Sequence, residues 1–144
     1  VEVTLPSDFP ELGLSAGMTV RLDGEQAYTF VKFRDVTVFN SAGTRLENEK
    51  VYLKAFMKQV YDITKTNITF PVGMYQQILD YTVTDITVDE MMYLASELLG
   101  YSVLESKIYT LPGETQKVNA FEEFHVDEQG LKETILDIFY EITD

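Results

Sequence analysis

Three basic residues gather around one short polar loop of the sequence. Lys32 and Arg34 are separated by a single residue, and Arg45 follows after a loop of small and polar residues. Guanidinium and ammonium groups bind oxyanions such as phosphate, and a guanidinium can do so through paired hydrogen bonds. The grouping predicts a local anion site. The alternative, that all three are ordinary solvated cations, stays open on spacing alone.

The other residues that could do chemistry form no catalytic pattern. The chain has one histidine and no cysteine. Thiolate chemistry and disulfides are therefore excluded, and a Ser–His–Asp triad or a His-rich zinc site has little support. His125 lies between Phe124 and Val126 and is expected to be a strand residue with a structural or exposed role. A basic stripe on one helix face is expected to be solvated; its members are Lys50, Lys54 and Lys58.

The negative charge of the chain is concentrated in its second half. The net charge is −13 over 144 residues. Residues 1–79 hold 8 Lys and Arg against 9 Asp and Glu, whereas residues 80–144 hold 3 against 15. Such an acidic half repels phosphate-dense partners, so a nucleic acid or an anionic lipid surface is not an expected partner. An anion that binds this chain is expected to bind locally, in the first half.

The helix that precedes the loop has a clear start signal. Asp23 and Gln26 match a capping box, in which the side chains of the first residue and of the residue three positions later bond to each other's backbone N–H. A helix is predicted from about Gly24 to Val31. Lys32 and Arg34 fall where this helix ends, and extended backbone there would turn both side chains to one side.

A second capping box follows the loop. Thr44 and Glu47 have the same spacing, so a helix is predicted to begin after Thr44 and to run to about Thr64. Arg45 would then be the first helical residue. The N-terminus of a helix carries a partial positive charge and free N–H groups, and anions bind there readily. An arginine at this position is easiest to understand if its fork reaches such an anion.

The remaining pattern mixes helices and strands without strict alternation. We expect a single α/β domain over residues 1–144, with mixed α+β as the alternative, built as a mixed sheet packed by several helices. A Pro112–Gly113 turn is expected between the last two strands. The expected strands are Val1–Leu5, Met18–Leu22, Glu105–Leu111 and Phe121–Val126. Further helices are expected near Val72–Asp80, after the Thr87–Glu90 capping box to about Leu99, and after Asp127.

Several segments of this sequence resemble the extracellular domain of the LytR-CpsA-Psr family of bacterial cell-envelope proteins, whose older label is cell envelope-related transcriptional attenuator. The family's usual pattern is a Leu-Asn-Gly-Glu-Gln-Ala stretch, a Tyr-Val-Arg-x-Arg stretch, a short loop, and Arg-x-x-Arg-Gln before an aromatic residue. The matching segments are Leu22–Ala27, Phe30–Arg34, Arg45–Tyr52 and the later Thr110–Gly113.

The resemblance implies a function and a set of binding residues. Members transfer glycopolymers such as teichoic acids or capsule from a polyprenyl-pyrophosphate carrier to peptidoglycan, with arginines and Mg²⁺ holding the pyrophosphate. By resemblance, Lys32, Arg34 and Arg45 match three of the arginine positions, and Glu49 stands where the family has a glutamine. These four residues are the candidate pyrophosphate site. The match departs from the family pattern at Lys32, Asn48 and Glu49.

The resemblance covers only the second half of the family domain. The magnesium ligands, further arginines and a membrane anchor are therefore expected upstream of Val1, and these 144 residues alone are expected to be inactive. The implied location is the extracellular face of the bacterial cytoplasmic membrane. The implied partners are a polyprenyl-pyrophosphate-linked glycopolymer and peptidoglycan, with no nucleic acid.

Three hypotheses remain open at this point. The chain is part of a glycopolymer transferase, or a degenerate domain that binds a polyprenyl-linked or anionic envelope ligand without turnover, or an acidic envelope interaction domain without a small ligand. The first two need the anion site around Arg34 and Arg45, and the third does not.

Overall fold

The computed structural model describes residues 1–100 and 108–140, and this part of the chain is mixed α+β. Its α-helices are α1 (Gly24–Lys32), α2 (Ser41–Thr64), α3 (Phe70–Ile78), α4 (Val88–Leu98) and α5 (Glu128–Phe139). Its strands are β1 (Glu2–Thr4), β2 (Thr19–Arg21), β3 (Gly113–Val118) and β4 (Phe121–Val126), and its 3₁₀ helices are η1 (Pro10–Leu12) and η2 (Leu79–Tyr81).

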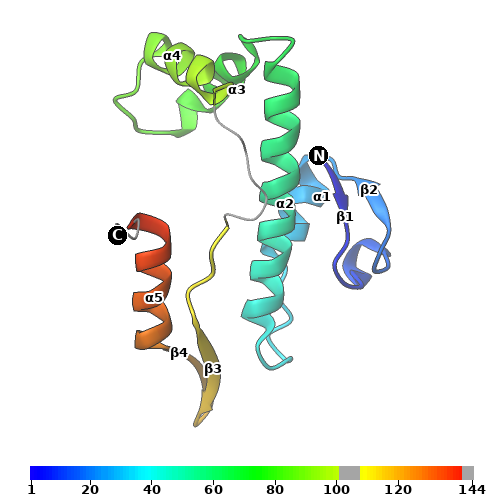
Figure 1. Cartoon of the computed structure of the whole chain (residues 1–144). Coiled ribbons are helices and arrows are strands. Elements are labelled where there is room, and N and C mark those ends of the chain that lie inside the picture. The colour runs from blue at the N-terminus through cyan, green and yellow to red at the C-terminus, as the bar shows by residue number, and fades with distance from the viewer. Residues whose placement is uncertain (101–107, 141–144) are drawn as a thin grey trace.

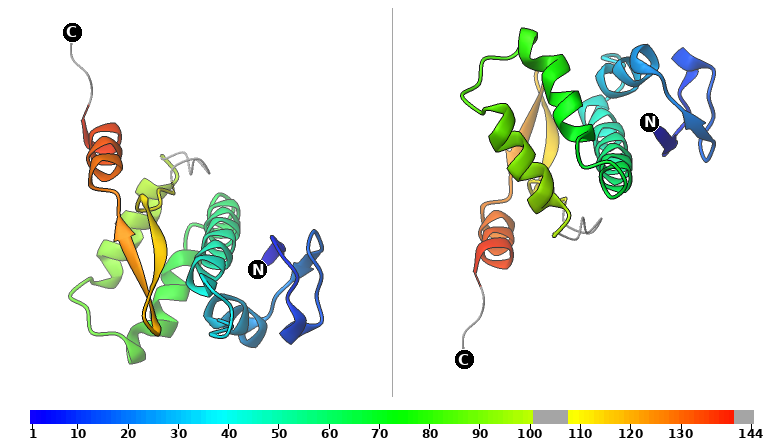
Figure 2. Two further views of the ribbon diagram at one scale, coloured as in Figure 1. Left: turned by 90° about the horizontal axis from the view of Figure 1, so that it is seen from below. Right: turned by 90° about the horizontal axis from the view of Figure 1, so that it is seen from above.

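Helix α2 is the long central element around which the others are arranged (Figure 1). The β1–β2 sheet and α1 pack against one side of it, and α3 with α4 lies at its C-terminal end. The β3–β4 hairpin and α5 lie on the other side (Figure 1). The views along α2 show α5 standing apart from it, and α5 makes at most sparse contacts with the other described elements (Figure 2).

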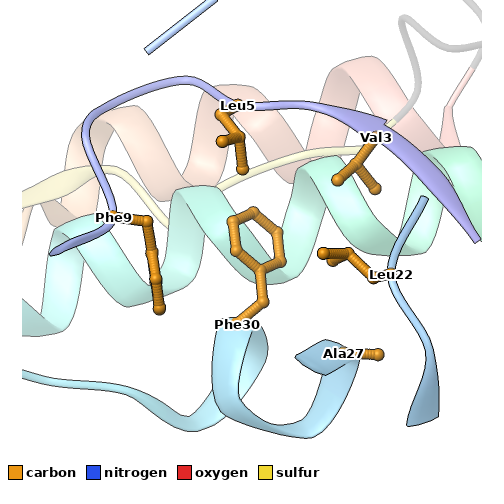
Figure 3. Packing of buried hydrophobic residues seen from close by; sticks show 6 residues of the cluster. All are labelled: Val3, Leu5, Phe9, Leu22, Ala27 and Phe30. Carbon is orange, nitrogen blue, oxygen red and sulfur yellow. The ribbon is translucent and has the colours of Figure 1, made fainter. Parts of the chain in front are cut away.

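The hydrophobic core lies between β1, β2, α1 and α2. Alternation along β1 turns Val3 inward and its two neighbours outward. Phe30 of α1 is fully buried, and its ring centroid lies 5.5 Å from that of Phe9. Figure 3 shows the side chains of Leu5, Phe9 and Leu22 around the Phe30 ring. This core fixes the end of α1, and hence the point at which the chain enters the loop of residues 33–40.

Two of the predicted capping boxes are present. The Asp23 side chain accepts a hydrogen bond from the backbone N–H of Gln26, and the Gln26 side chain accepts one from Asp23 N–H. Thr87 and Glu90 make the same pair of bonds at the start of α4. Asp127 caps α5, as predicted, by accepting from two backbone N–H groups.

The predicted start of α2 is wrong by a full turn. The helix begins at Ser41, after Asn40 in a left-handed conformation with φ 57°. Thr44 is therefore inside the helix, and Glu47 forms an ion pair with Lys50 at 2.7 Å rather than returning a capping bond. Arg45 is the fifth helical residue, not the first. The predicted end of α2 at Thr64 is confirmed.

The pairing of the C-terminal hairpin also differs from the prediction. Residues 108–111 are not in a strand, and 105–107 lie outside the described residues. Strand β4 pairs with β3, which starts at Gly113, so Pro112–Gly113 is not the turn. The chain reverses at Asn119, whose φ is 58°. Gly113 has φ 154°, and a Cβ there would lie 2.3 Å from the carbonyl oxygen of His125, so only glycine fits.

The predicted fold class is confirmed at the level of mixed α and β structure. The arrangement of the strands is simpler than expected. Among the described residues they form two separate antiparallel two-stranded sheets instead of one mixed sheet. That residues 1–144 form one domain stays a prediction.

Candidate anion-binding site

Arg34 lies at the centre of the candidate site. Helix α1 ends at Lys32, and Phe33 is extended with φ −60° and ψ 134°, which places Arg34 on the loop outside the helix. Its Nε donates to Ser41 Oγ at 3.0 Å, and its NH2 group lies 3.3 Å from Glu122 Oε2 on strand β4. The guanidinium therefore joins the start of α2 to a carboxylate 88 residues away in the sequence.

The same carboxylate binds a second donor. The backbone N–H of Asn40, the residue that precedes α2, donates to Glu122 Oε1 at 3.0 Å. One oxyanion is thus held by a guanidinium and by a backbone N–H at the N-terminal end of a 24-residue helix. The partial positive charge of that helix end adds to the attraction. This arrangement is able to bind a carboxylate or a phosphate oxygen.

A cavity of about 210 Å³ adjoins Arg34. Its wall includes Ser41, Thr44 and Asn48, which share one face of α2. Asn48 is only 3% exposed, and its Oδ1 atom is buried without a hydrogen-bond partner among the described residues. A buried polar atom of this kind is costly unless water or a ligand satisfies it. The cavity therefore places one buried acceptor beside Arg34, in a wall that also includes Phe9, Phe33 and Val38.

Arg45 lies next to these groups on α2. It is four residues from Ser41 and three from Asn48, which makes both of them its neighbours on the helix surface. Its Nε is 3.2 Å from Glu49 Oε1, one turn later. That Nε is buried and makes no hydrogen bond of good geometry. Arg45 and Glu49 thus form a local ion pair beside the site, so the guanidinium already has an intramolecular partner.

Lys32 is not brought to the same place. It is the last residue of α1, and its Nζ lies 5.5 Å from the centre of the Tyr28 ring. Residues four apart share a helix face, so this contact keeps Lys32 on the exposed face of α1. Of the four predicted site residues, Arg34 lies beside the start of α2, whereas Arg45 and Glu49 lie about one and two turns inside the helix. No described contact brings Lys32 to them.

The cavity wall itself is not basic. Asp8, Glu11 and Asp35 are among its lining residues. The hydroxyl and backbone N–H of Thr37 donate to Asp35 and lower its pKa below the usual value, so Asp35 stays ionised at neutral pH. An anion is therefore favoured only at the Arg34 and Asn40 donors. The exposed carboxylates and the buried Asn48 Oδ1 favour groups that donate hydrogen bonds.

Two other cations of α2 have carboxylate partners of their own. Lys50 pairs with Glu47, and Lys58 lies 2.6 Å from Asp62. The hydrogen bond from Lys58 is the main cause of the lowered pKa of Asp62. His125 lies on β4, as predicted, with its Nε2 3.8 Å from Glu123 Oε2. The ion pairs described for these groups do not involve Arg34.

Two further properties bear on the expected cofactor and anchor. Within residues 1–100 and 108–140, no group of three or more His, Cys, Asp or Glu side chains is placed to hold a metal ion. The magnesium ion implied by the resemblance stays a prediction, since such an ion is commonly held by one or two carboxylates together with substrate phosphates. Across the same ranges, no helix has the length and apolar character needed to cross a bilayer.

Sequence reasoning missed the groups that complete the site. The capping box at Thr44 predicts a helix start that is too late, and this leaves Asn40 and Ser41 in the predicted loop. Glu122 was one of many carboxylates in the acidic half, and nothing local marks it as a partner of Arg34. The only available signal was Asn40 itself, because Asn is one of the few residues that adopt a left-handed conformation readily.

The described residues form a mixed α+β structure, with a buried N-terminal core and a loop arginine bound to a carboxylate beside the start of a long helix. The model of the LytR_cpsA_psr family matches residues 1–137, so the chain belongs to the LytR-CpsA-Psr family, a family of the cell envelope. The predicted resemblance is thereby confirmed. Comparison with curated proteins and with solved structures finds no significant match.

Proposed function

We propose that this domain takes part in the transfer of a glycopolymer from a polyprenyl-pyrophosphate carrier to peptidoglycan, and that Arg34 contacts the pyrophosphate. The observation that carries the proposal is the oxyanion held jointly by Arg34 and by Asn40 N–H at the start of α2. Family membership supports the class of reaction.

The role of the site follows from the charge of the leaving group. When a phosphoryl group leaves a pyrophosphate, negative charge builds up on the departing oxygens. A fixed guanidinium and an N–H at a helix terminus stabilise this charge, because they are already oriented and need no rearrangement. In this proposal, Arg34 and Asn40 bind phosphate oxygens, and Arg45 supplies a second guanidinium when it parts from Glu49.

The remaining features of the proposed function come from the resemblance. We propose that the protein acts at the extracellular face of the bacterial cytoplasmic membrane on a teichoic acid or capsule polymer. A bound magnesium ion would neutralise part of the charge of the pyrophosphate.

The proposal is tested by titrating the 144-residue chain with inorganic pyrophosphate in a calorimeter. Arg34→Ala should weaken binding roughly 10- to 100-fold, since a hydrogen bond to a charged group contributes about 1.5–3 kcal/mol. Arg21→Ala, which removes an exposed arginine from β2, is the matched control and should leave the affinity unchanged. Equal affinities for wild type and Arg34→Ala would overturn the proposed site.

A second function is favoured by one observation. Arg34 and Arg45 are both paired with carboxylates of the same chain, Glu122 and Glu49. This pairing fits a domain that binds an anionic envelope ligand without turnover. Pyrophosphate binding is expected under both functions, and they separate on activity: only the transferase moves polymer from its carrier to peptidoglycan when the complete protein is assayed.

A further inference from the structure

We propose that Asn40 N–H and Arg34 form one anion subsite and that Glu122 is its built-in competitor. Binding of pyrophosphate and binding of the β3–β4 hairpin at the start of α2 would then be mutually exclusive. The inference rests on the anion site of the proposed function, which it extends by one ligand group and one competing residue.

The Glu122 carboxylate already occupies both donors of the proposed anion subsite. Its two carboxylate oxygens accept from two different donors, Arg34 NH2 at 3.3 Å and Asn40 N–H at 3.0 Å. An incoming phosphate oxygen needs the same donors, so it must displace the carboxylate. The side chain of Glu122 is partly shielded, with 23% exposed, which shows that it is seated against the loop.

Among the described residues, three hydrogen bonds link the hairpin to this loop. Besides the two bonds of Glu122, the hydroxyl of Thr115 on β3 lies 3.0 Å from Asn40 Oδ1. The hydrogen bonds that pair β3 with β4 are internal to the hairpin, so its release does not require them to break. A two-stranded hairpin on its own is only marginally stable, so these bonds open more often once the hairpin is released. Partly exposed ion pairs are weak, and the clasp of Arg34, Asn40, Thr115 and Glu122 is therefore readily opened.

Competition lowers the apparent affinity of the site. A ligand that binds only the open state sees its affinity reduced by the fraction of molecules in which the site is open. Loosening the clasp raises this fraction without adding any contact to the ligand. Glu122 would thus lower the apparent affinity of the site for pyrophosphate. Binding of pyrophosphate would in turn release the hairpin from the loop.

The test measures inorganic pyrophosphate affinity for three variants of the 144-residue chain. Glu122→Gln should tighten binding about three- to tenfold, because the neutral amide competes poorly. Thr115→Val loosens the hairpin without changing charge and should tighten binding in the same direction. Glu123→Gln removes an equal charge from the opposite face of β4 and is the matched control, with unchanged affinity expected.

Hydrogen exchange gives the second measurement. Pyrophosphate should speed exchange of the β3–β4 amides in wild type, as Glu122→Gln should do without ligand. If wild type binds pyrophosphate and neither Glu122→Gln nor Thr115→Val binds it more tightly, the competition is refuted while the Arg34 site stands. If Glu123→Gln tightens binding as much as Glu122→Gln, the effect is one of overall charge and the competition is again refuted. Failure of every variant to bind would overturn both inferences.

Discussion

At the scale of single residues, the affinity of the proposed site for an anion depends on which of its cations already have a partner within the chain. Lys32 lies against Tyr28, Arg34 holds Glu122, and Arg45 lies beside Glu49. The sequence predicted a cationic cluster, but not these partners. An ion pair between residues 88 apart leaves no local pattern, because it depends on where the hairpin folds back.

The Arg45–Glu49 pair offers a test of whether Arg45 shares the site. Glu49→Gln should tighten pyrophosphate binding two- to fivefold, since the freed guanidinium gains an anion, while helix stability changes by less than about 0.5 kcal/mol. Calorimetry and urea unfolding measure the two effects. Glu47→Gln, which breaks the pair with Lys50 on the same helix, is the control. An equal gain in both variants would show that Arg45 is not a ligand of the anion.

At the scale of elements, a capping box in the sequence predicts a helix start correctly when its first residue is the true N-cap of the helix. Asp23 and Thr87 are such residues, and both boundaries were predicted correctly. At Thr44 the signal failed because a capping box does not show whether the preceding residues are also helical. Asn40 adopts a left-handed conformation and starts α2 one turn earlier, which moves Arg45 away from the helix terminus.

The pairing of the C-terminal strands was also predicted incorrectly from the sequence. The Pro112–Gly113 dipeptide is a common turn signal, but Gly113 is needed here for its close approach to strand β4. The turn falls at Asn119 and Ala120, a two-residue connection with Asn in a left-handed conformation, typical of tight hairpins. This register turns Glu122 toward Arg34.

The capping box of α4 makes a pH-dependent prediction. The backbone N–H of Thr87, and then its hydroxyl, donate to Glu90 and lower the pKa of Glu90 below the usual glutamate value. The stabilisation is therefore present at neutral pH and is lost as the pH falls through the folded-state pKa. Thr87→Ala should raise that pKa part of the way back and destabilise the helix by about 1 kcal/mol.

Carboxyl resonances in an NMR pH titration report the pKa of Glu90, and urea unfolding reports the stability. Thr82→Ala, on the loop before α4, is the control and should change neither. An unchanged Glu90 titration in Thr87→Ala would mean that the hydroxyl does not bond the carboxylate in solution.

At the scale of the whole molecule, the largest cluster of buried apolar side chains lies in the N-terminal part of the chain. The chain exposes 10802 Å², whereas a compact monomer of 16.5 kDa exposes about 7,500 Å². The largest buried cluster lies in residues 3–30, while α5 leaves much of its apolar face open. The stability of the chain should therefore come mainly from the unit of β1, β2, α1 and α2.

Two phenylalanines test this distribution. Phe30 is 0% exposed and Phe139 is 74% exposed. Phe30→Ala should lower the free energy of unfolding by about 3–5 kcal/mol, and Phe139→Ala by less than about 0.5 kcal/mol. Urea midpoints compare them directly. A comparable loss in both variants would show that α5 is packed in solution as firmly as the core.

The anion site itself is tested most directly by NMR, with backbone amide and arginine Nε resonances followed while inorganic pyrophosphate is added. The Asn40 amide and the Arg34 Nε–H should shift together and saturate with one binding constant, and Arg21 Nε–H should not move. A saturating shift confined to the lysines of α2, with Asn40 and Arg34 unmoved, would contradict an anion site at the start of that helix.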